Sequence, residues 1–240
     1  DQIMPLNDFR QQNVPVYEPI IDPVITTSSE TIIYAEAGVG KTLFVTDLAY
    51  AVACGGHAIK WPVPKPRKVL IWDGEMAKAE LVDRYNKLVE RNNGFGPLNM
   101  NICSSMDYED EVDFLKPKWQ AILNRIIEKH QIEFLVLDNL SALFNLDQNK
   151  QADWTPAKIW LKKLRNKGLA TIIIHHANKS KTMFGTSDLS RQPNNVIALV
   201  RPDDYTAESG LVFDVRFEKA RSLYGDAVAP FRCSFNEYGR

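Results

Sequence analysis

Cysteine is scarce in this sequence, and long apolar runs are missing from it. The three cysteines, Cys54, Cys103 and Cys233, stand far apart, and no CxxC pair occurs. This pattern argues against a disulfide framework or a structural zinc site and favours a reducing compartment, so we expect a cytoplasmic protein. No run approaches the roughly 18 apolar residues of a membrane span, and the polar start lacks the layout of a secretion signal. We therefore expect no membrane association.

An excess of charge of either sign is also missing. The formal net charge is -1, which by itself favours neither nucleic acid nor any other charged partner, so the local distribution of charge has to decide. Hydrophobic residues make up 45% and charged residues 25% of the 240 positions, which is typical of one compact globular domain. This composition excludes disordered and fibrous proteins.

From Thr31 onward the chain alternates short apolar runs with helical patterns. That order is typical of βαβ units, so the predicted fold class is α/β, with a mostly parallel twisted sheet flanked by helices. Strands are predicted at residues 31–35, 68–73, 99–105, 133–138, 170–176, 195–200, 211–217 and 227–235. Helices are predicted at residues 41–54, 78–92, 117–129 and 156–167, the last with Thr155 as N-cap and Pro156 in its first turn.

The two ends of the chain depart from this pattern. The last three predicted strands follow one another through short loops, which indicates an antiparallel extension of the sheet at its C-terminal end. The first 30 residues are rich in proline and show no clear periodicity. We therefore expect an extended lead-in over residues 1–30 and a single domain over residues 31–240.

A glycine-rich loop between the first predicted strand and the first predicted helix is the strongest motif. It reads Ala35-Glu36-Ala37-Gly38-Val39-Gly40-Lys41-Thr42, with Ala35 in place of the usual first glycine. A strand, such a loop and a helix in this order predict a phosphate-binding loop, in which backbone amides and the helix dipole face the phosphates of ATP. Lys41 is expected to reach the β and γ phosphates, and the Thr42 hydroxyl to bind Mg²⁺. The predicted nucleotide contacts are Glu36, Ala37, Gly38, Val39, Gly40, Lys41, Thr42 and Leu43.

Carboxylates stand at the ends of two further strands. Asp138 ends the strand at residues 133–138, where we expect a ligand of Mg²⁺ on a strand next to the loop; a buried strand with an acidic turn is the alternative. Glu75 follows the strand at residues 68–73 and is the predicted group that orients or deprotonates the attacking water. Asp73 is its competitor for that role, and an N-cap for the next helix is the structural alternative.

In their order and spacing, these motifs resemble the RecA-like ATPases, and within them the hexameric replicative helicases of the plasmid RepA and DnaB type. Gly74-Glu75-Met76 is similar to the step of that group that carries the catalytic glutamate, and Asp138-Asn139-Leu140-Ser141 is similar to the turn after its Walker B strand. The resemblance spans residues 32–221. It implies a RecA-like P-loop fold, ATP and Mg²⁺ as cofactors, and a homo-oligomer that we expect to be a hexamer.

The resemblance also implies roles for two later segments. Residues 173–179 are similar to the strand and loop in which a polar residue senses the γ phosphate, so His175 or His176 would be the sensor; a structural pair or a metal site is the alternative. Lys219 and Arg221 match a Lys-x-Arg step that reaches the nucleotide of the neighbouring subunit in these hexamers. Arg221 would then be an arginine finger in trans with Lys219 as its partner, and a lysine-protected sheet edge is the alternative.

Basic residues gather in one stretch of the chain. Between Trp154 and Ser187 there are seven Lys or Arg residues and no acid, which suits a nucleic acid backbone. We expect Lys179 and Lys181, just past the sensor strand, to contact single-stranded DNA, with Lys150 in a second loop. For the lysines of the helix at residues 156–167, a solvated face is the simpler explanation.

Together these features predict a Mg-ATPase that couples hydrolysis to movement along, or unwinding of, single-stranded DNA. A regulatory or recombination-mediator ATPase that acts on a protein partner is the main alternative. A small-molecule kinase is a third class, and the two strands between the loop and Asp138 argue against it, as does the lack of an arginine-rich lid.

Overall fold

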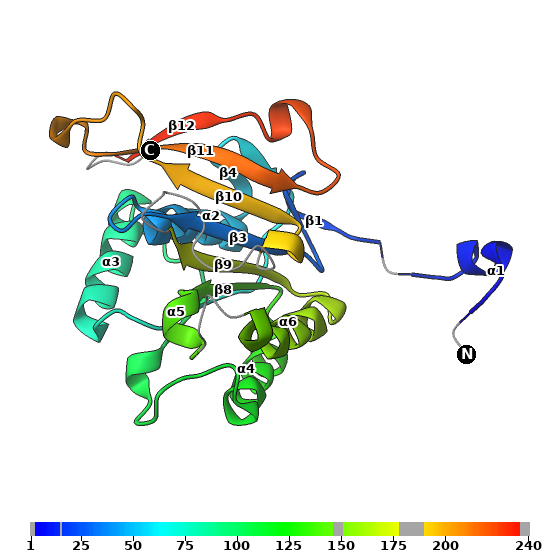
Figure 1. Ribbon diagram of the computed structural model, residues 1–240. Helices are drawn as coiled ribbons and strands as arrows, with labels where there is room; N and C mark the ends of the chain where they lie inside the picture. Colours follow the sequence, from blue (N-terminus) through cyan, green and yellow to red (C-terminus); the bar gives the residue numbers. More distant parts are fainter. Residues whose placement is uncertain (1–2, 15, 146–150, 178–189, 236–240) are drawn as a thin grey trace.

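In the computed structural model, which describes residues 3–14, 16–145, 151–177 and 190–235, one large sheet runs through the molecule (Figure 1). Its strand order is β12-β11-β10-β3-β9-β8-β6-β7. Neighbouring strands are parallel from β10 to β7, whereas β11 is antiparallel to both β10 and β12. The strands are β3 (Glu30–Ala35), β6 (Val69–Asp73), β7 (Met100–Ser104), β8 (Phe134–Asp138), β9 (Ala170–His176), β10 (Asn195–Val200), β11 (Leu211–Ala220) and β12 (Phe231–Phe235). The predicted α/β class with a C-terminal antiparallel extension is confirmed.

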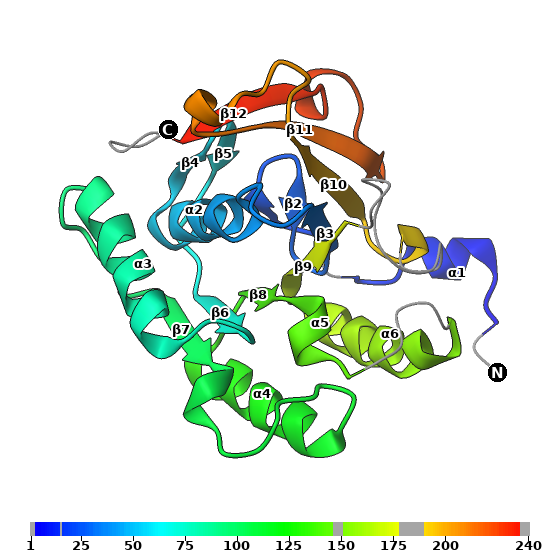
Figure 2. The ribbon, with the colours of Figure 1, turned by 60° about the vertical axis from the view of Figure 1, so that its left-hand side comes forward.

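Helices cover both faces of the parallel part of the sheet (Figure 2). Along β8, which is buried throughout, Phe134 and Val136 belong to the core that contains α2 (Lys41–Cys54). Leu135 and Leu137 alternate with them and belong to the core that contains α4 (Pro117–His130) and α6 (Gln151–Asn166). Because both faces of the sheet are covered, the sequences of the central strands are continuous apolar runs instead of alternating apolar and polar residues.

Two short antiparallel strand pairs add to the core that contains α2. They are β1 (Pro19–Ile21) with β2 (Ile25–Thr26) and β4 (Gly56–Ala58) with β5 (Trp61–Val63); β4 contacts α2, and β1 contacts β5. After Asp47 the helix is apolar on all sides, as expected for an enclosed helix. Ile20, Ile21 and Ile25 are almost fully buried, so the second half of the predicted lead-in packs with the domain. The short helix α1 (Leu6–Arg10) contains no buried residue and lies away from the sheet (Figure 1).

The remaining helices and turns include one clear departure from the sequence prediction. They are α3 (Lys78–Arg91), α5 (Leu140–Leu143) and the 3-10 turns Ser105–Asp107, Ala207–Ser209 and Gly225–Ala227. The predicted start of α6 at Thr155 and Pro156 is wrong, because the helix begins at Gln151 and Pro156 lies inside it. Proline removes one helical hydrogen bond, and the burial of Trp154, Ala157 and Trp160 on the same helix outweighs that local preference.

The carboxyl ends of the parallel strands meet at one edge of the sheet. There Ala35 lies beside His176, and Asp73 lies beside Asp138. The opposite edge contains Glu30, the first residue of β3, and Asn195, the first residue of β10. In the part of the chain that the structure describes, no helix combines the length and the apolarity that crossing a membrane requires.

Candidate active site

The loop between β3 and α2 leaves backbone amides available at the start of a long helix. Gly40 is the N-cap of α2, and no side chain caps the helix there. Amides at an uncapped helix start, together with the helix dipole, attract anions. Gly40 has a φ of 112°, and a Cβ at this position would lie 3.0 Å from a methyl carbon of Leu211, so both its conformation and its surroundings require glycine.

Lys41 points back into this loop. Its Nζ donates hydrogen bonds to the carbonyl oxygens of Ala35, at 3.0 Å, and of Glu36, at 2.9 Å. Burial lowers the pKa of the Lys41 ammonium, and the negative charges of Asp138 and Glu75 oppose that shift. The structure therefore brings the predicted phosphate-binding lysine together with both predicted carboxylates.

Asp138 ends β8 and is only 6% exposed. Its pKa is raised to about 6, chiefly by burial and also by the charges of Asp73 and Glu75, while a hydrogen bond with Thr42 and the charge of Arg84 oppose the rise. The expectation that Asp138 sits on a strand next to the loop is wrong in one respect, because β9 lies between β3 and β8. The start of α2 reaches across β9, so Thr42 still contacts Asp138.

The donor atoms at this point of the site fit a magnesium ion. Mg²⁺ prefers oxygen ligands and keeps several waters, and Thr42 and Asp138 offer a hydroxyl and a carboxylate joined by a hydrogen bond. When bound with ATP, the ion neutralises charge on the β and γ phosphates. Within the described ranges, no group of three or more His, Cys, Asp or Glu side chains is arranged to bind a metal ion. These two residues would therefore bind the ion together with the nucleotide and water.

The two carboxylates after β6 have different surroundings. Asp73 is buried, and its Oδ1 accepts hydrogen bonds from the amides of Glu75, at 3.0 Å, and Met76, at 2.7 Å. It therefore organises the turn that presents Glu75, whose side chain is exposed. The N-cap of α3 is Ala77, which makes no side-chain capping bond, so neither carboxylate caps that helix.

Asn139 is a site residue to which the sequence prediction gave no separate role. It is 3% exposed; its Oδ1 caps α5 by accepting from the amide of Ala142, and its Nδ2 donates to Oε2 of Glu75. The strands approach closely here, because the Gly74 amide donates to the Asp138 carbonyl at 2.6 Å. A Cβ on Gly74 would lie 2.8 Å from Leu143. The turn Asp138-Asn139-Leu140-Ser141 marks Asn139 in the sequence, but its contact with Glu75 depends on the pairing of β6 with β8.

The two adjacent histidines lie in different environments. His175 is fully buried opposite Tyr34, whereas His176 is opposite Ala35 at the end of β9 and is half-buried. Burial and the charge of Lys41 lower the pKa of His176, and the charge of Glu75 opposes that shift. His176 is therefore the histidine that shares the site with the loop lysine and the candidate base.

Comparison with known families agrees with this geometry. The model of a family described as an AAA domain matches residues 3–182, about three quarters of the chain. The chain belongs to the AAA domain family. Together with the fold, this membership makes it a P-loop ATPase domain of the RecA-like kind. No curated protein matches the chain significantly.

Arg201 is a second residue beside the phosphate loop that the sequence prediction missed. It directly follows β10, and its Nη2 lies 3.7 Å from the position that a Cβ on Gly38 would occupy. Its guanidinium also stacks on the ring of Tyr205, at 4.7 Å from the ring centroid. No motif of the sequence marks this arginine, because its place beside the loop depends on the pairing of β10 with β3.

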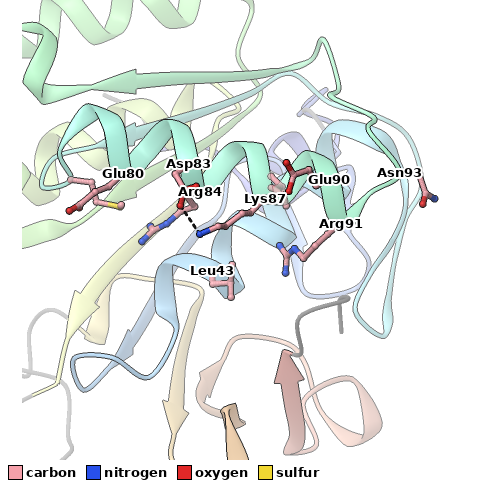
Figure 3. Close-up of a pocket in the computed structure, with 10 residues that line it drawn as sticks. Leu43, Glu80, Asp83, Arg84, Lys87, Glu90, Arg91 and Asn93 are labelled. Carbon is pink, nitrogen blue, oxygen red and sulfur yellow. Dashed lines mark ion pairs between the residues drawn. The ribbon is translucent and has the colours of Figure 1, made fainter.

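Leu43 lines a cavity beside the loop rather than the loop itself. The cavity has a volume of about 1040 Å³ and lies between the start of α2 and α3, with charged side chains along the α3 side (Figure 3). Two ion pairs border it, Lys87 with Asp83 and Arg91 with Asp47. The part of Leu43 that can serve the nucleotide is therefore its backbone amide, near the start of α2.

Lys219 and Arg221 lie at the opposite edge of the sheet from their own phosphate loop. Ala220, between them, pairs with Asn195, which in turn pairs with Thr31 near the start of β3. The structure therefore does not bring them together with Lys41 or Glu75 of the same chain.

The predicted DNA contacts Lys150, Lys179 and Lys181 lie outside the described residues. On α6, Trp160 and Leu164 are buried, while Lys162 and Lys163 are exposed. The simpler explanation for the basic residues of that helix, a solvated face, agrees with this burial pattern.

Proposed function

We propose that this AAA domain hydrolyses Mg-ATP in a homo-oligomeric ring, expected to be a hexamer, and uses the energy to move along or unwind single-stranded DNA. The observation that carries the proposal is the position of Lys219 and Arg221. β3 has six residues and separates them from their own phosphate loop, which corresponds to roughly 20 Å at the rise of a strand. An arginine side chain does not span that length, so a phosphate contact by Arg221 requires a neighbouring subunit.

Within one subunit, each residue has a role that its contacts support. The loop amides and Lys41 bind the phosphates, and Thr42 and Asp138 bind the ion. Glu75 orients and deprotonates the attacking water, in the orientation that Asn139 fixes by its hydrogen bond. His176 lies close enough to Lys41 and Glu75 to sense whether a γ phosphate is present.

Subunit mixing tests the shared site. Lys41→Ala subunits lack a working phosphate loop but keep Arg221, and Arg221→Ala subunits have the reverse defect. Each variant alone should hydrolyse ATP slowly, at about a thousandth of the normal rate, whereas a mixture should regain a measurable fraction. Failure of all mixtures to regain activity, with assembly intact, would show that Arg221 does not act in trans.

The DNA function is tested by ATPase rates with and without single-stranded DNA at one fixed salt concentration. We expect DNA to stimulate hydrolysis in the wild type and the double change Lys179→Ala/Lys181→Ala to remove the stimulation, because phosphate contacts depend on these charges. Lys162→Ala/Lys163→Ala is the matched control, since it removes the same charge from the exposed face of α6. Equal loss of stimulation in both double variants would argue against a specific DNA loop.

A regulatory ATPase that acts on a protein partner is the second candidate function. The observation that favours it is the exposure of large apolar side chains near the start of the chain, with Ile3 at 92%, Leu6 at 72% and Phe9 at 60%. Exposed apolar residues grouped in this way are common at protein interfaces. An assembled ring whose ATPase rate does not respond to DNA would favour this function.

A further inference from the structure

The segment of residues 190–194 connects the predicted finger to the start of β3. Asn194 makes two bonds with Glu30, since its amide donates to the Glu30 carbonyl at 2.7 Å and its Oδ1 accepts from the Glu30 amide at 3.1 Å. Nε2 of Gln192 donates to Oε2 of Glu30 at 2.9 Å. Glu30 therefore anchors the segment through both its backbone and its carboxylate.

The other side of the same segment contacts the finger pair. Nζ of Lys219 donates to the carbonyl oxygens of Ser190 and Arg191, each at 2.6 Å, and Nη2 of Arg221 donates to the Arg191 carbonyl at 2.7 Å. The backbone amide of Arg221 also donates to the Asn194 carbonyl at 2.9 Å. The position of both cations is thus set by carbonyl groups of this short segment.

Glu30, Lys219 and Arg221 also interact through their charges. Lys219 and Arg221 repel each other, and the charge of Arg221 contributes to lowering the pKa of Lys219 after burial, whereas Glu30 opposes the shift. Burial of the Glu30 side chain, which is 3% exposed, raises its pKa. The hydrogen bond from Gln192 and the positive charges of Arg165, Lys219 and Arg221 all oppose that rise. A buried carboxylate surrounded in this way is costly unless its cations stay in place.

We propose that Glu30 is a positioning residue for the trans finger: its buried carboxylate fixes residues 190–194, and the carbonyl oxygens of that segment fix Lys219 and Arg221. The proposal rests on the proposed trans action of Arg221. The side chain of Arg221 is exposed and borders a cavity of about 600 Å³ that is also lined by Arg165 and Tyr17, so it is accessible to a neighbouring subunit. Glu30 itself would touch no nucleotide.

Glu30 begins the strand that leads into its own phosphate loop, so it could also affect that loop directly. Mixed oligomers separate the two roles. In the first mixture, Glu30→Gln is added to the Lys41→Ala subunit, which donates the finger to Arg221→Ala partners. In the second, Glu30→Gln is added to the Arg221→Ala subunit, which carries the working loop but no finger. Glutamine keeps the size of the side chain and an oxygen acceptor for Gln192 but removes the negative charge.

We expect the first mixture to lose about tenfold in kcat relative to the parent mixture, with KM for ATP within about twofold, because a finger acts in the transition state. The second mixture should match its parent, since the subunit that carries Glu30→Gln has no finger to misplace. Glu218→Gln on the finger donor is the matched control. Glu218 is a carboxylate beside Lys219 that hydrogen-bonds Tyr34 instead of residues 190–194.

The outcomes distinguish the two proposals. Loss in the second mixture, or equal loss in both, would overturn the positioning role and assign Glu30 to its own phosphate loop or to folding. If the parent mixture shows no complementation, the trans finger itself is wrong, and the role of Glu30 falls with it. Gln192→Leu on the finger donor is the second variant, because it removes the bond to the carboxylate without altering β3 and should reproduce the loss in kcat.

Discussion

Nδ2 of Asn139 donates a hydrogen bond to Oε2 of Glu75 and thereby links the residue after β8 to the carboxylate after β6. The same side chain caps α5 through its Oδ1, so its rotation is restricted on both sides. Glu75 is otherwise exposed, and an exposed carboxylate samples several rotamers. For the proposed role of Glu75 in activating water, Asn139 would therefore set the direction in which the carboxylate points.

The change Asn139→Asp tests this role. Aspartate keeps an oxygen acceptor for the amide of Ala142 but replaces the donor to Glu75 by a like charge. We expect kcat to fall by about tenfold or more while KM for ATP stays within about twofold, since the base would be misaligned only for the chemical step. Thermal unfolding should show a small change, because the cap is retained. An unchanged kcat would show that Asn139 does not orient Glu75 for the chemical step.

Asp138 should cost the protein stability near neutral pH. Burial holds its pKa at about 6, above the ordinary value of 3.8, so the folded state favours the protonated form. As pH rises from about 4 to about 6, the unfolded state loses this proton before the folded state does, so the free energy of unfolding falls. Above that range the total loss is about 3 kcal/mol. We expect Asp138→Asn to raise the Tm of the nucleotide-free protein at pH 7.5 and to abolish Mg-dependent hydrolysis.

The pH dependence of that comparison provides its control. At pH 4 the wild-type carboxyl is protonated in the folded state and resembles the amide, so the difference in Tm between wild type and Asp138→Asn should nearly vanish. A variant that is less stable than wild type at pH 7.5 would mean that the hydrogen bond with Thr42 outweighs the burial of the charge.

The local parts of the site could be predicted from the sequence, whereas contacts between strands could not. The loop around Gly40 and Lys41 is recognisable because strand, glycines and helix follow one another in the chain. The position of β9 between β3 and β8 is a matter of strand order, which depends on contacts between residues far apart in the chain and is not marked by any local motif. For the same reason, the bond from Asn139 to Glu75 and the place of Arg201 beside Gly38 left no sequence signal of their own.

Periodicity alone also failed to choose between His175 and His176. Both end an apolar run, and the register of β9 with β3 determines which one lies beside Lys41. Likewise, the start of α6 was misplaced because a proline is a strong local signal, while the burial of Trp154 before it is a tertiary effect.

Substitution of each histidine should separate their roles. We expect His176→Ala to lower kcat by about tenfold with little effect on Tm, because the side chain is half-buried and faces charged groups. His175→Ala removes a fully buried ring and should mainly lower stability, by about 2 kcal/mol or more. The reverse pattern, with activity lost at His175 and stability lost at His176, would contradict the assignment.

Protonation gives a second test of His176. Its pKa is lowered from the ordinary value of 6.5 by burial and by Lys41, so the ring is neutral at pH 7 and gains a proton only in more acidic solution. Activity that depends on neutral His176 should therefore be constant between pH 7 and pH 8. In His176→Gln, which cannot titrate, any acidic limb due to this ring should disappear.

Arg201 should contribute to binding of the nucleotide rather than to the chemical step. Its guanidinium lies beside Gly38 of the loop and is oriented by the ring of Tyr205, on the side of the sheet where the antiparallel extension begins. A cation fixed at that point attracts the phosphates equally in the ground state and in the transition state. We therefore expect Arg201→Ala to raise KM for ATP by about tenfold and to leave kcat within about twofold.

Arg216→Ala is the matched control, because Arg216 is an exposed arginine on β11 that pairs with Asp214 at 3.1 Å. Arg201→Lys should recover part of the affinity if charge matters more than stacking on Tyr205. A fall in kcat without a change in KM would instead place Arg201 among the groups that act on the transferring phosphate.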